Sequence, residues 1–154
     1  MLPRVEARKL IQNLNIHNLP VNMTGVCNAL GIDIFYDSMV GLDGYFIQNQ
    51  ERRKYLIIVG DSVGLCRQRF SIAHELGHIR MNHGRVGFSA AGKVTRSPHL
   101  EASANMFASE LLMPKTLLQR FGFLTPERIA EVCQVSLETA FIRAREMGWG
   151  GKYE

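Results

Sequence analysis

The segment from His74 to His78 holds the most informative chemistry in this sequence: two histidines separated by three residues, with Glu75 directly after the first. On an α-helix, residues four apart lie one turn apart on the same face, so both imidazoles can bind one divalent metal ion, usually zinc. Glu75 is rotated about 100° from His74 around the helix axis, which suits a general base better than a second ligand beside it. The pattern predicts a metal site with His74 and His78 as ligands and Glu75 as the catalytic base.

The residues around this pattern favour a buried helix. Apolar residues recur at helical spacing on the side opposite the histidines, namely Ile72, Leu76 and Ile79. Small or aromatic residues flank the histidine side, namely Phe70, Ala73 and Gly77. Polar groups on a buried helix need partners, and a metal ion is one. The alternative interpretation is a surface helix that carries a few polar residues.

A catalytic zinc site needs a third protein ligand and one open position for water. The downstream residues that could supply it are His83, His99, Glu101 and Glu110. His83 would lie about 140° from His78 on a continuing helix, so it could bind only if the helix ended first. The metzincin arrangement is excluded, because Gly84 stands where the third histidine of that class is required.

Glu101 is the preferred third ligand. A second helix is expected over residues 97–114, between a serine–proline start and a proline stop. Asn105 lies one turn after Glu101 on the same face and could hold a ligand histidine in place, whereas Glu110 lies on the opposite side. The alternative for Glu101 is an acidic first-turn residue that interacts with the helix dipole.

The remaining elements predict an α+β fold. Helices are expected at 4–14, 23–30 and 115–120, then one that opens at Thr125-Pro126 and a last one at 136–147, and strands at 33–36, 44–48 and 55–59. We expect the strands to form an antiparallel three-stranded meander, with the strand at 55–59 on an edge that could receive a substrate as an added strand. The loop at 85–96 is either a plain connection or a mobile flap over the cleft.

The last two helices resemble a helix-turn-helix, in which the second helix would expose Thr139, Arg143 and Glu146. The alternative is a helical hairpin that packs on the rest of the chain. The net charge of +4 is spread along the sequence, which disfavours contact with DNA.

Composition bounds the class of protein. The 154 residues suit one domain, no stretch is long and apolar enough for a membrane span, and the first residues do not resemble a secretory signal. Cys27, Cys66 and Cys133 are far apart, so we expect reduced thiols without a zinc role, in a cytoplasmic protein.

Three segments resemble the ImmA/IrrE family of metallo-endopeptidases: 69–78 (RFSIAHELGH), 101–114 and the helix start at 135–140. The resemblance implies a zincin-like peptidase domain at 1–114 and a helical hairpin at 115–154 packed on it. It implies one zinc ion held by His74, His78 and Glu101, with Asn105 in support. Family members are small bacterial or phage proteases that cut helix-turn-helix repressors and so switch on mobile-element, prophage or stress genes.

One role is left open by the sequence, namely the group that stabilises the oxyanion. The candidates are His83, His99, Tyr45 and Arg96. Three other functions also remain open: a catalytically silent metallopeptidase-like partner, an antitoxin-type DNA-binding regulator, and a zinc hydrolase that acts on small peptides.

Overall fold

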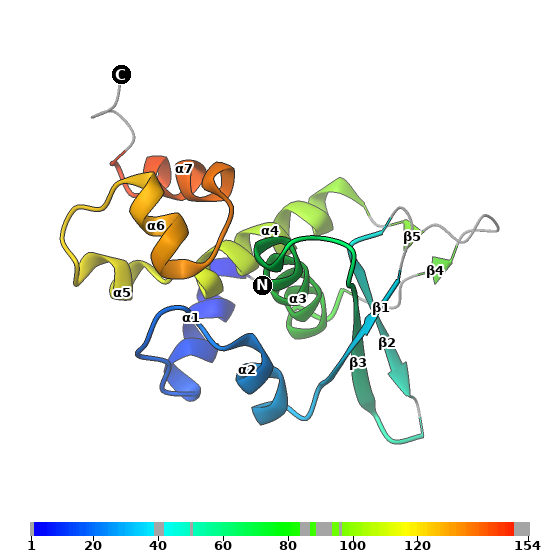
Figure 1. Cartoon of the computed structure of the whole chain (residues 1–154). Helices are drawn as coiled ribbons and strands as arrows, with labels where there is room; N and C mark the ends of the chain where they lie inside the picture. Colours follow the sequence, from blue (N-terminus) through cyan, green and yellow to red (C-terminus); the bar gives the residue numbers. More distant parts are fainter. Residues whose placement is uncertain are drawn as a thin grey trace.

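The computed structural model describes residues 2–38, 42–49, 51–83 and 97–149, together with the backbone of 87–88 and 94–95. Figure 1 shows a helical body beside a small three-stranded sheet, and a separate pair of short strands. The elements in chain order are α1 (Pro3–Asn13), α2 (Met23–Ala29), β1 (Asp33–Asp37), β2 (Gly44–Asn49), β3 (Lys54–Gly60), α3 (Leu65–Arg80), β4 (Gly87–Phe88), β5 (Val94–Thr95), α4 (Pro98–Leu112), α5 (Lys115–Gln119), α6 (Pro126–Cys133) and α7 (Leu137–Glu146). The predicted α+β class is confirmed.

The three-stranded sheet is mixed, so the predicted antiparallel meander is wrong. Its order is β1-β3-β2, with β1 parallel to β3 and β2 antiparallel to it. The reason lies in β3, where the consecutive residues Ile57, Ile58 and Val59 are all at least 95% buried, a pattern typical of a central strand covered on both faces. The prediction of an edge strand at 55–59 is therefore also wrong, and the edges of this sheet are β1 and β2.

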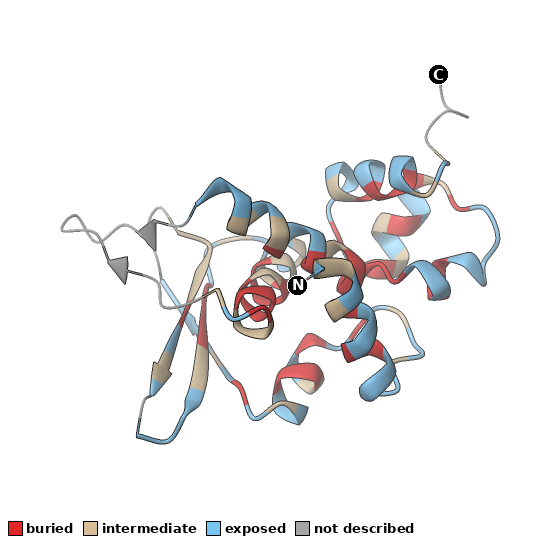
Figure 2. Cartoon of the chain, turned by 180° about the vertical axis from the view of Figure 1, so that it is seen from behind, coloured by how far each residue is buried: buried red, intermediate tan, exposed pale blue. Residues whose placement is uncertain are grey.

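The main core lies on the face of the sheet to which Ile57 and Val59 belong. Phe46 of β2 and Ile57 of β3 are paired in register and buried, and α3 packs against these two strands. Helix α4 packs on α3, and α1 packs on α4, so the buried residues gather between the helices (Figure 2). Both helices that carry the predicted site residues are thus held by the centre of the core. None of the helices in the described ranges combines the length and the apolar run that a bilayer span requires.

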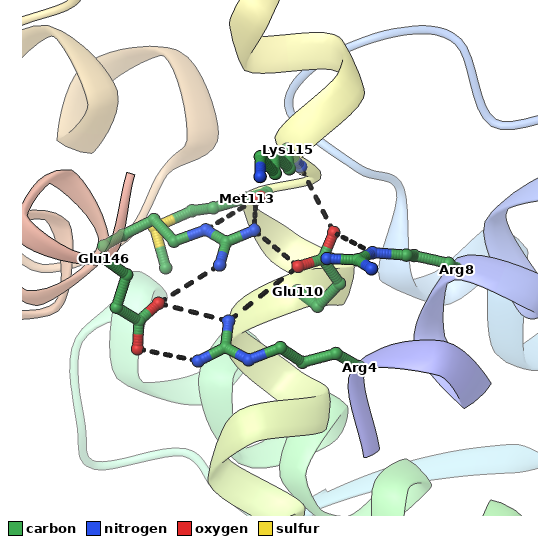
Figure 3. A network of polar contacts seen from close by, with 7 residues as sticks. Arg4, Arg8, Glu110, Met113, Lys115 and Glu146 are labelled. Atoms are coloured by element: carbon green, nitrogen blue, oxygen red, sulfur yellow. Dashed lines mark hydrogen bonds and ion pairs between the residues drawn. The ribbon is translucent and has the colours of Figure 1, made fainter. Parts of the chain in front are cut away.

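The C-terminal helices are tied to α4 by a buried ion pair. Arg143 of α7 donates to Glu110 of α4 at 2.6 Å, and it also donates to the carbonyl of Met113. Figure 3 shows Glu110 between Arg4 and Arg8, which reach it from α1. Arg143 is only 2% exposed, which disfavours the helix-turn-helix alternative, in which α7 would present this residue to DNA.

A second buried arginine ties α3 to the same helical pair. Arg69 donates to the carbonyls of Cys133 and Gln134, at the junction between α6 and α7, and to the carbonyl of Val21. Gln134 adopts a left-handed conformation with φ 53°, which ends α6 and turns its last carbonyl groups toward the arginine. Each of the two helices that carry the predicted site therefore has its own polar anchor on the α6–α7 pair.

Candidate metal centre

Helix α3 presents His74, Glu75 and His78 as the sequence predicted. The helix runs without interruption through all three residues. His78 is completely buried and Glu75 is 4% exposed, so these polar side chains lie inside the protein. A buried imidazole and a buried carboxylate are stable there only with polar or metal partners.

Helix α4 brings Glu101 to the histidines. Ser97 caps its N-terminus by accepting a hydrogen bond from the backbone N–H of Leu100, and Pro98 occupies the first turn, as predicted. Glu101 is the acidic residue of that first turn. The helix lies close to α3 because Gly77, between the two histidines, has no side chain where it meets the ring of Phe107.

Three ligand atoms converge between the two helices. Nε2 of His74 lies 2.9 Å from Oε2 of Glu101, and Nε2 of His78 lies 3.0 Å from Oε1 of the same carboxylate. The two Nε2 atoms are 3.1 Å apart. A tetrahedral zinc ion with bonds of about 2.0–2.1 Å separates its ligand atoms by about 3.3 Å, close to these spacings.

The outer nitrogens of both imidazoles have partners of their own. Nδ1 of His74 lies 2.8 Å from Oδ1 of Asn105, and Nδ1 of His78 lies 2.8 Å from Nδ1 of His83. With a proton on each Nδ1, both Nε2 atoms turn lone pairs toward each other and toward a carboxylate. Such a set of acceptors fits a divalent cation, because a cation is attracted by all three.

A cleft of about 350 Å³ opens beside these groups. Its walls come from the start of β2 and from α3 and α4: Leu42, Asp43, Gly44, Arg67, Phe70, Ser71, His74, Glu75, Glu101 and Asn105. Arg67 of α3 and Asp43, directly before β2, form an ion pair of 2.7 Å within this lining. Ser71, one turn before Glu75 on the same helix, also lines the cleft and was not predicted from the sequence.

The four oxyanion candidates lie in different places. His83 contacts His78 on the Nδ1 side of that ring, away from the converging Nε2 atoms. His99 is exposed in the first turn of α4, and Tyr45 neighbours Gly44 on β2 without lining the cleft. Arg96 lies outside the described residues, as does most of the 85–96 loop that was considered as a flap.

Comparisons with known proteins indicate a metallopeptidase family. Residues 27–145 match the peptidase M78 family model, described as the IrrE N-terminal-like domain. Metallopeptidase ImmA of Bacillus subtilis is 30% identical over 99 residues, which cover 63% of this chain and 57% of that protein. A Mycobacterium tuberculosis transcriptional regulator superposes on 92% of this chain and 45% of its own, with a TM-score of 0.66. The two sequences are 15% identical, so this likeness shows a shared fold alone.

The chain thus spans little more than half the length of ImmA and less than half of the regulator. The family match nevertheless covers most of the chain and includes both α3 and α4, with the residues that converge between them. The chain therefore belongs to the ImmA/IrrE family of metallopeptidases.

Proposed function

We propose that this chain is a zinc-dependent endopeptidase in which His74, His78 and Glu101 hold the metal and Glu75 is the general base. The observation that carries the proposal is the convergence of two Nε2 atoms and one carboxylate within 2.9–3.1 Å of one another, beside an open cleft. Two imidazoles and one carboxylate form a ligand set of catalytic zinc, with one position left for water or substrate.

Zinc bound there would polarise the scissile carbonyl and favour deprotonation of the attacking water. Glu75 lines the same cleft one residue after His74, so its carboxylate can accept the proton of that water. The same carboxyl group then donates the proton to the leaving amine, which restores the base for the next turnover. Burial of Glu75 at 4% exposure keeps bulk water from competing for that proton.

The substrate would lie along β2 as an extended segment, instead of along the 55–59 strand. Strand β2 is an edge of the sheet, and its first residue, Gly44, lines the cleft. A Cβ atom on Gly44 would lie 3.8 Å from Cγ of Glu75, so the strand begins directly beside the proposed base. An edge strand is the part of a sheet to which an extended chain can be added, which suits a protein substrate.

We further propose that this substrate is a helix-turn-helix transcriptional repressor, cut to derepress mobile-element, prophage or stress genes. The support is membership of the ImmA/IrrE family, and a helix-turn-helix repressor encoded beside this gene would be the first candidate substrate.

The test compares Glu75→Gln with wild type and with Glu131→Gln, an exposed glutamate on α6. Each protein is loaded with one equivalent of zinc and incubated with the purified neighbouring repressor, and the cleavage products are measured by mass spectrometry. Glu75→Gln should bind zinc and fold normally but lose about 10²–10⁴-fold in cleavage rate, while Glu131→Gln stays at the wild-type rate. Cleavage by Glu75→Gln at the wild-type rate would show that Glu75 is not the base.

The same experiment separates the enzyme from a catalytically silent partner. A silent partner would bind the repressor without cutting it, and Glu75→Gln would then behave like wild type in every measurement. A regulator that acts on DNA through α7 is disfavoured, because Arg143 is buried against α4.

A further inference from the structure

The last turn of α3 ends in a Schellman motif that returns the chain onto the proposed metal ligand. The N–H of His83 donates to the carbonyl of His78 at 3.0 Å, and the N–H of Asn82 donates to the carbonyl of Ile79 at 3.2 Å. Asn82 takes the left-handed position that the motif requires, with φ 55°. This motif often brings the side chains at its two ends into contact, and those residues are here His78 and His83.

The contact between the two rings is polar and close. Nδ1 of His83 lies 2.8 Å from Nδ1 of His78, and the ring centroids are 5.0 Å apart at an interplanar angle of 64°. His78 is completely buried, so its orientation is set by the groups around it. A hydrogen bond between two Nδ1 atoms requires a proton on one of them and a lone pair on the other.

The arrangement on the other side of the His78 ring decides which nitrogen carries that proton. Nε2 of His78 faces Glu101 and Nε2 of His74, where the proposed metal would take its lone pair. A neutral imidazole whose Nε2 lone pair binds a metal must hold its proton on Nδ1. His83 must then accept through Nδ1 and keep its own proton on Nε2.

We propose that His83 is a positioning residue, which fixes the tautomer and the ring orientation of His78 by accepting a hydrogen bond at Nδ1. The inference rests on the proposed metal site. Each of the two ligand histidines would then have an acceptor at Nδ1, because Oδ1 of Asn105 contacts Nδ1 of His74 in the same way. Hydrogen-bond partners of this kind on the far side of a ligand histidine typically contribute 10–100-fold to metal affinity.

Two substitutions at this position separate the hydrogen bond from simple packing. His83→Leu removes the acceptor and keeps an apolar side chain beside His78. His83→Asn keeps an acceptor at the same point, because Oδ1 of asparagine and Nδ1 of histidine are both bonded to Cγ. His17→Leu is the matched control, since His17 is an exposed histidine in a different part of the chain, outside the lining of the metal-site cleft.

The full chain is titrated with cobalt(II) at one fixed pH, and its dissociation constant and visible absorption spectrum are measured. His83→Leu should weaken cobalt binding about 10–100-fold and alter the spectrum, while His83→Asn returns both toward wild type and His17→Leu leaves both unchanged. The free energy of unfolding without metal is measured alongside, and the affinity loss of His83→Leu should exceed any change in it.

Two results would overturn the proposal: wild-type cobalt binding and spectrum in His83→Leu, or equal losses in His83→Leu and His83→Asn. His74→Ala, measured in parallel, distinguishes this failure from failure of the metal site itself. If His74→Ala binds cobalt as tightly as wild type, the proposed site is wrong. If His74→Ala loses cobalt while His83→Leu retains it, the site stands and only the role of His83 is wrong.

Discussion

Gly77 of α3 lies directly against Phe107 of α4, at the point where the two helices that carry the proposed ligands are packed together. A Cβ atom built on Gly77 would lie 3.0 Å from Cδ1 and 3.2 Å from Cβ of Phe107. Phe107 is completely buried, and its Cβ cannot move without the backbone of α4. The separation of α3 and α4, and with it the distance from Glu101 to the histidines, therefore depends on glycine at this position.

Gly77→Ala should weaken metal binding. Alanine normally stabilises a helix by about 1 kcal/mol relative to glycine, but here the added methyl group must push the two helices apart. We expect the free energy of unfolding to fall by about 1–3 kcal/mol. Zinc affinity should fall further than in a variant that is equally destabilised at a position away from the α3–α4 contact. Isothermal titration with zinc and urea unfolding measure the two effects.

Gly64→Ala is the control for this substitution, because nothing lies within 4 Å of the Cβ position of Gly64 at the start of α3. Its zinc affinity should match that of wild type. The double variant Gly77→Ala/Phe107→Leu removes most of the ring and should recover part of the affinity. Unchanged zinc binding in Gly77→Ala would show that the spacing of α3 and α4 is not set here.

The part of the site that the sequence predicted is the part that depends on local periodicity. His74 and His78 share a face because they are four residues apart on one helix, and Asn105 follows Glu101 by the same interval. The helix that presents Glu101 could also be placed, because Ser97 provides the cap that defines its start. Each of these relationships is contained within a few turns of one helix.

The parts that were missed or predicted wrongly depend on contacts between distant segments. Strand order was wrong because the pairing of β1 with β3 is set by a crossover, although the run of buried residues in β3 is a signal that it is central. The alternative with Arg143 exposed to DNA remained open because its buried partner, Glu110, lies 33 residues away. His83 was considered as a metal ligand if the helix ended first and as an oxyanion stabiliser, and its contact with His78 depends on the left-handed turn at Asn82.

The buried pair of Arg143 and Glu110 predicts a large effect on stability. Both side chains are at most 2% exposed, and Arg143→Met would leave Glu110 without its closest partner. Loss of one member of a buried ion pair typically costs about 3–5 kcal/mol, and Arg8 still pairs with Glu110, so we expect about 3 kcal/mol. Urea unfolding of the metal-free protein measures this loss.

Arg128→Met provides the comparison, because Arg128 pairs with Glu131 at the surface, where both side chains are more than half exposed. It should cost less than about 1 kcal/mol. The double variant Arg143→Met/Glu110→Gln should lose less stability than the sum of the two single losses. Each single substitution leaves the charge of the other residue in the core, whereas the double substitution removes both charges. Equal costs for Arg143→Met and Arg128→Met would contradict a stabilising role for the buried pair.

Two buried thiols predict loss of stability at alkaline pH. Burial raises the pKa of Cys27 and, despite the nearby Arg69 and Arg143, that of Cys133, each to about 12. In the unfolded chain such thiols ionise near pH 8.5, so between about pH 9 and 12 the native state binds more protons than the unfolded state. The free energy of unfolding should therefore fall with rising pH, by about 1.4 kcal/mol per pH unit for each thiol.

Urea unfolding between pH 8 and 10.5 measures that slope. Cys27→Ala should reduce the slope by about 1.4 kcal/mol per pH unit, whatever its effect on stability at neutral pH. Val26→Ala, at a neighbouring buried position without a thiol, should lower stability and keep the wild-type slope. The same slope in Cys27→Ala and wild type would show that this thiol does not remain protonated in the native protein.

Metal binding itself should be visible as thermal stabilisation that depends on Glu101. A ligand that binds only the native state at about 100 times its dissociation constant adds about 2.7 kcal/mol, which for a domain of this size raises Tm by about 5–10 °C. Glu101→Gln should lose most of this zinc-dependent shift, because a neutral amide is a poorer ligand than the carboxylate that lies within 3.0 Å of both Nε2 atoms. Glu75→Gln should keep the shift, since Glu75 is proposed as a base. Calorimetry with zinc, and after its removal by a chelator, measures Tm for each protein, and an undiminished shift in Glu101→Gln would show that α4 supplies no ligand.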